Sequence, residues 1–253
     1  MARSAPVPPP LLLIHGIGDS HRTWRDVLPR LDGHFECLAI DLPGFGDAPP
    51  LPGTPTMAAL GAHCRAWMAA RGFERFHVAG NSLGGGVALW LALSGAVDSA
   101  CGLSPIGFIA DWDRAYLHVS LAALRHGASA LAAVAPRLPA PGRRLAFAQY
   151  FAHADRFAPE RLAETLRGVA AATAFEATQR HAVNWQCPAR TGLPCPVTVA
   201  WGQKDLLLLR GPQSARARRR LPSARHVVLY DCGHVPSWDD PAQTAAIIRT
   251  STA

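Results

Sequence analysis

Residues 78–89 read VAGNSLGGGVAL, which places a serine between an apolar run and three consecutive glycines. The apolar residues Arg75–Ala79 before it predict a buried strand, and Gly85–Ser94 after it is compatible with a helix. The turn between them, Gly80-Asn81-Ser82-Leu83-Gly84, has the form G-x-S-x-G. A strand, this turn and a helix together are the context in which the motif presents a nucleophilic serine.

There is a physical reason why glycine flanks Ser82 on both sides. So sharp a turn strains the serine backbone, and a side chain at Gly80 or Gly84 would collide with the neighbouring strand or helix. We therefore expect Ser82 at the carboxyl end of the sheet, where open α/β sheets bind ligands. The alternative is that Ser82 only caps a helix within a Ser/Gly-rich loop.

A serine hydroxyl needs a base, and His234 in DCGHVPSWDDP directly follows the apolar run His226–Tyr230. An imidazole base needs an orienting carboxylate, and Asp205 in VTVAWGQKD follows the preceding run. Asp231 and Asp41 are rival carboxylates. We favour Asp205, because Asp231 is so close to His234 that it is expected to shape the turn, and Asp41 lies in a Pro-Gly loop.

Short apolar runs bounded by Gly, Pro or Asp recur along the chain and predict buried parallel strands. Helix-compatible segments such as Thr56–Arg71 alternate with them, which indicates a doubly wound α/β architecture. The predicted strands are Leu11–Ile14, Glu36–Ile40, Arg75–Ala79, Ser99–Leu103, Val197–Trp201 and His226–Tyr230.

Residues 108–189 break this alternation, because they are rich in Ala, Leu and Arg at helical spacing and contain no convincing strand. We expect a helical cap inserted into a core made of residues 1–107 and 190–253. The expected cap helices are Asp111–His126, Arg143–Ala152, Pro159–Ala171 and Thr173–Asn184, interrupted by Pro136, Pro139 and Pro141.

The composition is that of a globular protein, with 49% hydrophobic and 17% charged residues and a net charge of +7. Because the basic residues are nearly all arginine in an Ala-, Pro- and Gly-rich chain, we attribute the charge to coding bias and expect no nucleic-acid or membrane partner. The arginines at 216 and 218–220 are expected to form a solvated helix face.

Six scattered cysteines are expected to be reduced, and no metal or cofactor site is expected. The proline-rich start, Pro6–Pro10, is expected to be an extended lead-in, and neither a signal peptide nor a membrane span is expected, so the predicted location is cytoplasmic.

Five motifs follow one another along the chain: LLLIHGIGDSHRTW, IDLPGFGDAP, GNSLGG, WGQKD and CGHVPSWDDP. In this order the chain resembles the α/β-hydrolase superfamily, in its small cap-bearing branch of serine hydrolases that includes esterases and C–C hydrolases. The resemblance implies a catalytic triad of Ser82, Asp205 and His234, with His15 in a structural role. It also implies an oxyanion hole formed by the backbone N–H groups of Ile17 and Leu83, with Gly18 as a substitute for Ile17.

The chain departs from the family pattern at its start, because the strand before His-Gly begins near residue 11 and leaves no room for the usual preceding hairpin. We therefore expect about six parallel strands, with Glu36–Ile40 near an edge unless the lead-in covers it.

The resemblance favours a serine hydrolase that cleaves a carboxylic ester or related acyl compound through an acyl-enzyme. Its partner is expected to be an apolar small molecule, with Phe108 and Trp112 as the best candidates for the pocket; the oligomeric state is left open. Two alternatives are C–C hydrolysis of a dienone-type metabolite, mildly favoured by GNS and Trp238, and a non-enzymatic ligand receptor. An epoxide hydrolase or dehalogenase is disfavoured, because such relatives carry Asp where Ser82 stands.

Overall fold

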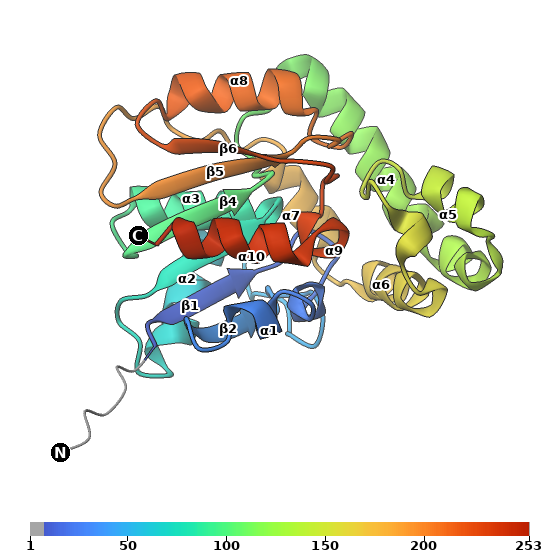
Figure 1. Ribbon diagram of the computed structural model, residues 1–253, viewed down its shortest axis with the longest axis horizontal. Helices are drawn as coiled ribbons and strands as arrows, with labels where there is room; N and C mark the ends of the chain where they lie inside the picture. Colours follow the sequence, from blue (N-terminus) through green and yellow to red (C-terminus); the bar gives the residue numbers. More distant parts are fainter. Residues whose placement is uncertain (1–7, 253) are drawn as a thin grey trace.

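The computed structural model describes residues 8–252 and contains one six-stranded parallel sheet (Figure 1). The strand order is β2-β1-β3-β4-β5-β6, which confirms the expected α/β class and the expected number of strands. Residues 6 and 7 of the proline-rich lead-in lie outside the described residues. The strands are β1 (Pro10–Ile14), β2 (Glu36–Ile40), β3 (His77–Asn81), β4 (Ser99–Leu103), β5 (Val197–Gly202) and β6 (Arg225–Leu229).

Burial along the strands follows their position in the sheet. Every residue of the inner strands β4 and β5 is buried, as expected where helices cover both faces of a parallel sheet. β2 and β6 form the edges and are each buried only at their last residue. The expected edge position of Glu36–Ile40 is therefore confirmed, and residues 8–252 contain no antiparallel strand.

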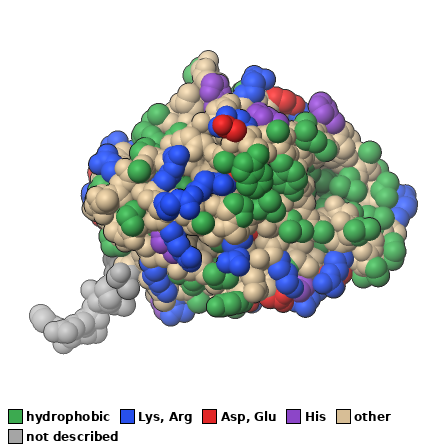
Figure 2. All heavy atoms as spheres, turned by 90° about the horizontal axis from the view of Figure 1, so that it is seen from above, with side chains coloured by type: hydrophobic (Ala, Val, Ile, Leu, Met, Phe, Trp, Pro, Cys, Tyr) green, Lys and Arg blue, Asp and Glu red, His purple; other side chains and the backbone are tan. Residues whose placement is uncertain are grey.

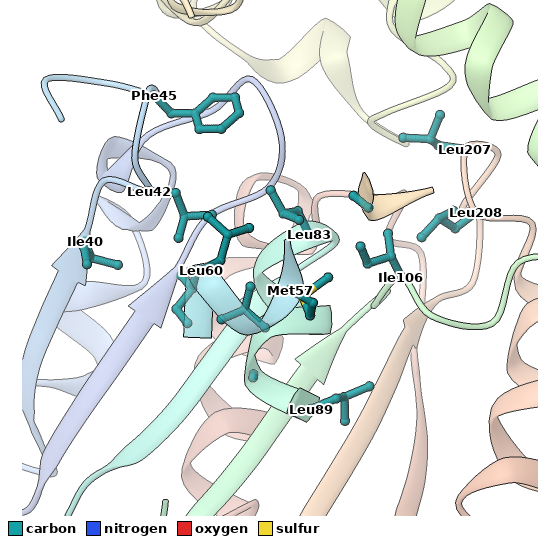
Figure 3. Close-up of a cluster of buried hydrophobic side chains, with 14 of the residues drawn as sticks. Ile40, Leu42, Phe45, Met57, Leu60, Leu83, Leu89, Ile106, Leu207 and Leu208 are labelled. Atoms are coloured by element: carbon teal, nitrogen blue, oxygen red, sulfur yellow. The ribbon is translucent and has the colours of Figure 1, made fainter. Parts of the chain in front are cut away.

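Two hydrophobic clusters lie on opposite faces of the sheet. One contains side chains of α2 (Met57–Ala69), α3 (Leu83–Leu93) and α8 (Arg210–Arg220), and Figure 3 shows part of it around the start of α3. The other packs α1 (Leu28–Leu31) and α10 (Pro241–Thr250) against the sheet. The sheet is thus covered on both sides, and the carboxyl ends of the strands are left for the site.

A helical insert follows β4 and returns to β5, as expected from the sequence, and lies beyond the carboxyl ends of the strands (Figure 1). Three of its helices differ from expectation, and the one predicted at Thr173–Asn184 spans only Phe175–Ala182. α4 continues eight residues past His126, and α5 ends at Ala146, so residues 147–152 are not helical. The insert contains α4 (Asp111–Val134), α5 (Ala140–Ala146), α6 (Pro159–Ala171) and α7 (Phe175–Ala182), and the short helices of the chain are η1 (His21–Trp24), η2 (Ala135–Arg137), η3 (Ala154–Arg156) and α9 (Pro236–Asp239).

The arginine-rich face of α8 is only partly solvated, which corrects the expectation. Arg216 donates to the backbone oxygen of Phe108 and to Asp113, and Arg220 Nη1 donates to the Cys187 oxygen at 2.6 Å. These arginines therefore attach α8 to both ends of the insert. All six cysteines are free, and within residues 8–252 no helix is long and apolar enough to cross a bilayer.

Candidate active site

Ser82 occupies a strained turn between the end of β3 and the start of α3. Its backbone has φ 55° and ψ −112°, and positive φ is shared by only two other non-glycine residues in the described chain, Ser104 and Asp231. Such a conformation costs on the order of 1–3 kcal/mol and persists only where the surroundings enforce it. The hydrogen bond from Ser82 N to Leu103 O, 2.9 Å long, helps to hold the turn in place.

The glycines on either side of Ser82 lie where no side chain fits. A Cβ atom on Gly80 would be 2.2 Å from the Gly84 oxygen, and one on Gly84 would be 2.3 Å from the Ile14 oxygen. The sequence-based explanation of the two glycines is therefore confirmed.

The next two glycines, Gly85 and Gly86, also lie where a side chain would collide with its neighbours. A Cβ on Gly85 would lie 2.9 Å from Pro105 Cβ, and one on Gly86 would lie 2.6 Å from Ile106 Cγ1. The run of three glycines thus lets the first turn of α3 pass close to β1 and to the segment after β4.

His234 and Asp205 meet in the interior. His234 Nδ1 lies 2.9 Å from Asp205 Oδ2, and the two residues are 2% and 3% exposed. The other carboxylate oxygen, Oδ1, accepts the backbone N–H groups of Leu207 at 3.0 Å and Leu208 at 2.9 Å. Because an ionised carboxylate only accepts hydrogen bonds, the His234 proton belongs on Nδ1, and Nε2 keeps a free lone pair.

The nitrogen that would face the serine has no protein partner. His234 Nε2 is covered from solvent and accepts no hydrogen bond from the described residues, Ser82 included. Ser82 and His234 line one cavity together. In enzymes without substrate, the bond between nucleophile and base is often long and tightens only when substrate binds.

Asn81 connects the serine turn to the histidine loop. Its Nδ2 donates to the backbone oxygens of Leu103 at 3.0 Å and of His234 at 2.8 Å, and the side chain is 2% exposed. We did not predict this role from the sequence. The signal for it was an amide directly before the serine, at the end of an otherwise apolar strand.

The expected oxyanion donors lie beside the serine. Leu83 is the first residue of α3, whose amino end favours negative charge, and a Cβ added to Gly16, the neighbour of Ile17, would be 3.3 Å from Ser82 Cβ. Among the backbone bonds of the described residues, neither Ile17 N–H nor Leu83 N–H has an acceptor. Neither N–H group therefore has a competing acceptor among these bonds.

Two apolar cavities meet at Ser82. The inner cavity, of about 70 Å³, is walled by hydrophobic side chains of the insert and by Ser82 and His234. The smaller side cavity shares Ile17, Ser82, Leu121 and Leu207 with it. Insert residues of the inner cavity are Leu121, Leu124, Phe147, Tyr150, Phe151, Leu162, Thr165, Leu166 and Val169.

Comparison with known proteins gives the family. The sequence profile described as the alpha/beta hydrolase family matches residues 11–247. The chain belongs to this family. An uncharacterized protein of Mycobacterium tuberculosis is 31% identical over 258 residues, which cover 95% of this chain and 74% of that protein.

Solved structures of alpha/beta hydrolases share the fold. An esterase from Thermogutta terrifontis superposes with a TM-score of 0.76 at 21% identity, covering 96% of this chain and 89% of that one. The 2-hydroxy-6-oxo-6-phenylhexa-2,4-dienoate hydrolase of a Rhodococcus species has a TM-score of 0.73 at 21% identity, covering 96% and 90%. At these identities the likeness concerns the fold alone.

The rival carboxylates have other partners. Asp41 accepts the His21 N–H at 2.6 Å and the Asp47 N–H at 3.0 Å. Burial alone would raise the pKa of Asp41, but these hydrogen bonds outweigh it and the pKa is lowered. Asp231 Oδ2 lies 2.7 Å from His153 Nε2, and its other oxygen binds Lys204. Neither carboxylate contacts His234.

His15 shapes the loop after β1. Its Nε2 accepts the Leu42 N–H at 2.9 Å, and its Nδ1 lies 2.7 Å from the Gly16 oxygen. Burial lowers the pKa of His15, which keeps the ring neutral. With both nitrogens occupied, His15 is unavailable as a base, in agreement with its expected structural role.

Phe108 and Trp112 do not line the cavity of Ser82, which corrects the expected pocket. Phe108 is fully buried and packs edge-on against Trp201, with ring centres 6.2 Å apart. Trp112 is 56% exposed near the start of α4. Figure 2 shows the face that carries α8 and this end of α4, with hydrophobic side chains gathered at its middle. The pocket is instead built from side chains deeper in the insert.

Proposed function

We propose that this hydrolase cleaves carboxylic esters with Ser82 as nucleophile, His234 as base and Asp205 as the orienting acid. One observation carries the proposal. The buried imidazole of His234 has Nδ1 on Asp205 and a free Nε2, and it shares an apolar cavity with a serine held in a strained turn. The chain order of serine, acid and histidine is that of alpha/beta hydrolases.

The proposed reaction has two halves. Nε2 of His234 takes the proton of Ser82 Oγ as that oxygen attacks the ester carbonyl, and the N–H groups of Ile17 and Leu83 bind the oxyanion. Collapse breaks the bond to the alcohol, which leaves with the proton from His234. A water then attacks the acyl-serine by the same route, releases the acid and restores Ser82.

The two cavities support an apolar substrate. An ester carbonyl at Ser82 would place one part of the molecule in the inner cavity and the other in the side cavity, both walled by hydrophobic side chains. We propose that residues 108–189 serve as a cap, since they supply half of the residues that line these cavities, and that residues 1–107 and 190–253 form the catalytic core.

C–C hydrolysis is the second candidate. The two residues that favoured it in the sequence, Asn81 and Trp238, both make hydrogen bonds within the protein. Asn81 binds backbone oxygens, and Trp238 donates to Thr23 Oγ1 at 3.0 Å and does not line the inner cavity. Trp238 is therefore not available to a dienone in the inner cavity, and Asn81, which lines that cavity, has its amide nitrogen bound to the two backbone oxygens. Ester hydrolysis remains the better supported proposal.

The test is a turnover screen of Ser82→Ala against Ser94→Ala, a serine at the far end of α3. Both variants and the parent are assayed on short aryl esters and on a dienone-type C–C substrate. We expect multiple turnovers of the esters by the parent and Ser94→Ala, and loss of at least about 10³-fold in kcat for Ser82→Ala. Faster turnover of the dienone would favour the second candidate. Binding without turnover of any substrate would favour a receptor.

A further inference from the structure

A third cavity, which we call the arginine cavity, adjoins the inner cavity. It measures about 310 Å³ and shares Gly18, Asp19 and Thr165 with the inner cavity. Its wall contains Arg22 and Arg25 on one side and Arg161 and Arg167 of α6 on the other, and it also includes Asp47, Glu164 and the ring of Trp238. The arginine cavity therefore lies directly beside the cavity that contains Ser82.

Arg22 and Arg25 of this cavity are only loosely paired with carboxylates, whereas Arg161 is paired with Asp26. Arg22 lies 3.6 Å from Glu164 and 3.8 Å from Asp47, and Arg25 also lies 3.6 Å from Glu164. These separations exceed the 2.7–2.9 Å typical of a charge-assisted hydrogen bond. Among the hydrogen bonds of residues 8–252, the side chains of Arg22, Arg25 and Arg167 donate none. One glutamate is thus shared loosely by two guanidinium groups.

Arg161 adds a fixed positive charge. Its Nη1 binds Asp26, and its guanidinium carbon lies 3.8 Å from the centre of the Trp238 ring. Its Nε and Nη2 are buried and have no partner among the described residues. This guanidinium therefore keeps hydrogen-bonding capacity that the protein does not use.

Asp19 stands at the junction of the two cavities. Burial raises the pKa of its carboxyl group. Its Oδ1 accepts the Ser20 N–H at 2.8 Å, so the side chain is held at the wall.

We infer that the arginine cavity binds an anionic oxygen group, a carboxylate or a phosphate, at the far end of an ester whose carbonyl lies at Ser82. The inference rests on the proposed function and narrows its substrate class to apolar esters that carry a terminal anion. Planar guanidinium groups match both anions, so the chemistry of recognition is the same for either.

The test compares matched aryl esters in three forms: a neutral ester, a half-ester with a carboxylate at the end of the acyl chain, and an ester with a carboxylate on the leaving group. We expect the parent to favour at least one anionic form in kcat/KM. In Arg22→Gln and Arg25→Gln that preference should fall about five- to tenfold through KM. Arg219→Gln, an exposed arginine of α8, should keep the preference of the parent. An equal preference in all variants would overturn the inference.

A second measurement separates binding from turnover. Ser82→Ala is titrated by calorimetry with monomethyl adipate and with inorganic phosphate, and again after Arg22→Gln is added. Saturable binding of either anion that weakens about five- to tenfold with Arg22→Gln supports the cavity, and the stronger of the two identifies the anion. If neither anion binds, the inference is overturned, even if ester turnover is intact. Failure of every ester in the first test, with anion binding preserved, would instead defeat only the proposed hydrolysis.

Discussion

At the scale of single residues, the proposed chemistry rests on the different surroundings of the two ring nitrogens of His234. Nδ1 is bound to a carboxylate that two backbone N–H groups hold in place, whereas Nε2 is free. An imidazole in this tautomer accepts a proton through Nε2, and the imidazolium that forms is stabilised by Asp205.

Asp205→Asn tests this tautomer. The amide oxygen can still accept the Leu207 and Leu208 N–H groups, but the amide nitrogen would then face Nδ1 and force the proton onto Nε2. We expect kcat for ester hydrolysis to fall by about 10³- to 10⁴-fold with little loss of stability. Steady-state kinetics and urea unfolding check the two quantities.

Asp231→Asn is the matched control. Asp231 is three positions from His234 and has φ 58°, a conformation that Asn tolerates, but it binds His153 and Lys204. We expect kcat within about threefold of the parent, since exposed ion pairs contribute little. A larger loss of kcat in Asp231→Asn than in Asp205→Asn would show that Asp231, and not Asp205, orients His234.

The lowered pKa of Asp41 predicts that the stability of the fold depends on pH. Its pKa is below the ordinary value of 3.8 in the folded chain, so its ionised form stabilises the fold above pH 3.8 and this stabilisation is lost as the pH falls through the lower, folded pKa. Asp41→Asn lacks this titration. The difference in unfolding free energy between parent and variant should therefore shrink as the pH falls from 6 toward 3. A difference independent of pH would contradict the assignment.

At the scale of elements, the strands were readable from the sequence because each is a short apolar run ended by Gly, Pro or Asp. β2 and β4 have the predicted bounds, whereas β3 begins and ends two residues later than predicted. Gly80 and Asn81 continue the ladder with β4, a pairing that no local pattern reveals. α4 passes through Gly127 without a break, because a lone glycine weakens a helix but does not end it.

Glycine substitutions separate the turn from an ordinary helix. Gly80→Ala would drive a methyl group to 2.2 Å from the Gly84 oxygen, so we expect destabilisation by at least about 3 kcal/mol or failure to fold. Gly127→Ala on α4 meets nothing within 4 Å and should stabilise the chain by up to about 1 kcal/mol. Thermal and urea unfolding measure both. An unfolding free energy of Gly80→Ala equal to that of the parent would show that the turn is not tightly constrained.

At the scale of the whole molecule, the parallel sheet and the position of the insert followed from the alternation of strands and helices. The residues of the candidate triad were also readable, because each follows a strand and the strand ends converge. The walls of the cavities could not be read from the sequence, since they depend on how α4, α6, α7 and the segment after α5 pack over the sheet. Phe108 and Trp112 were chosen for their place in the chain, and burial and exposure put them elsewhere.

Asp239 joins the insert to the histidine loop. Its carboxylate accepts the backbone N–H groups of Ala152 and His153 from the insert and of Gly233 from the loop, at 2.7–3.0 Å. Asp239→Ala removes all three bonds, so we expect faster hydrogen exchange at these amides and a higher KM for esters. Asp32→Ala, an exposed residue after α1, is the control. Unchanged exchange at Ala152 and His153 would mean that other contacts hold the insert.

The most direct measurement is pre-steady-state hydrolysis of a short aryl ester, followed by the release of the phenol and by the mass of the quenched protein. With Ser82 as nucleophile, the parent should release up to one phenol per molecule in a burst, gain the acyl mass on the peptide that carries Ser82, and then turn over steadily. Ser82→Ala should show neither the burst nor the acyl mass. Steady turnover by a folded Ser82→Ala at the rate of the parent would contradict catalysis by Ser82.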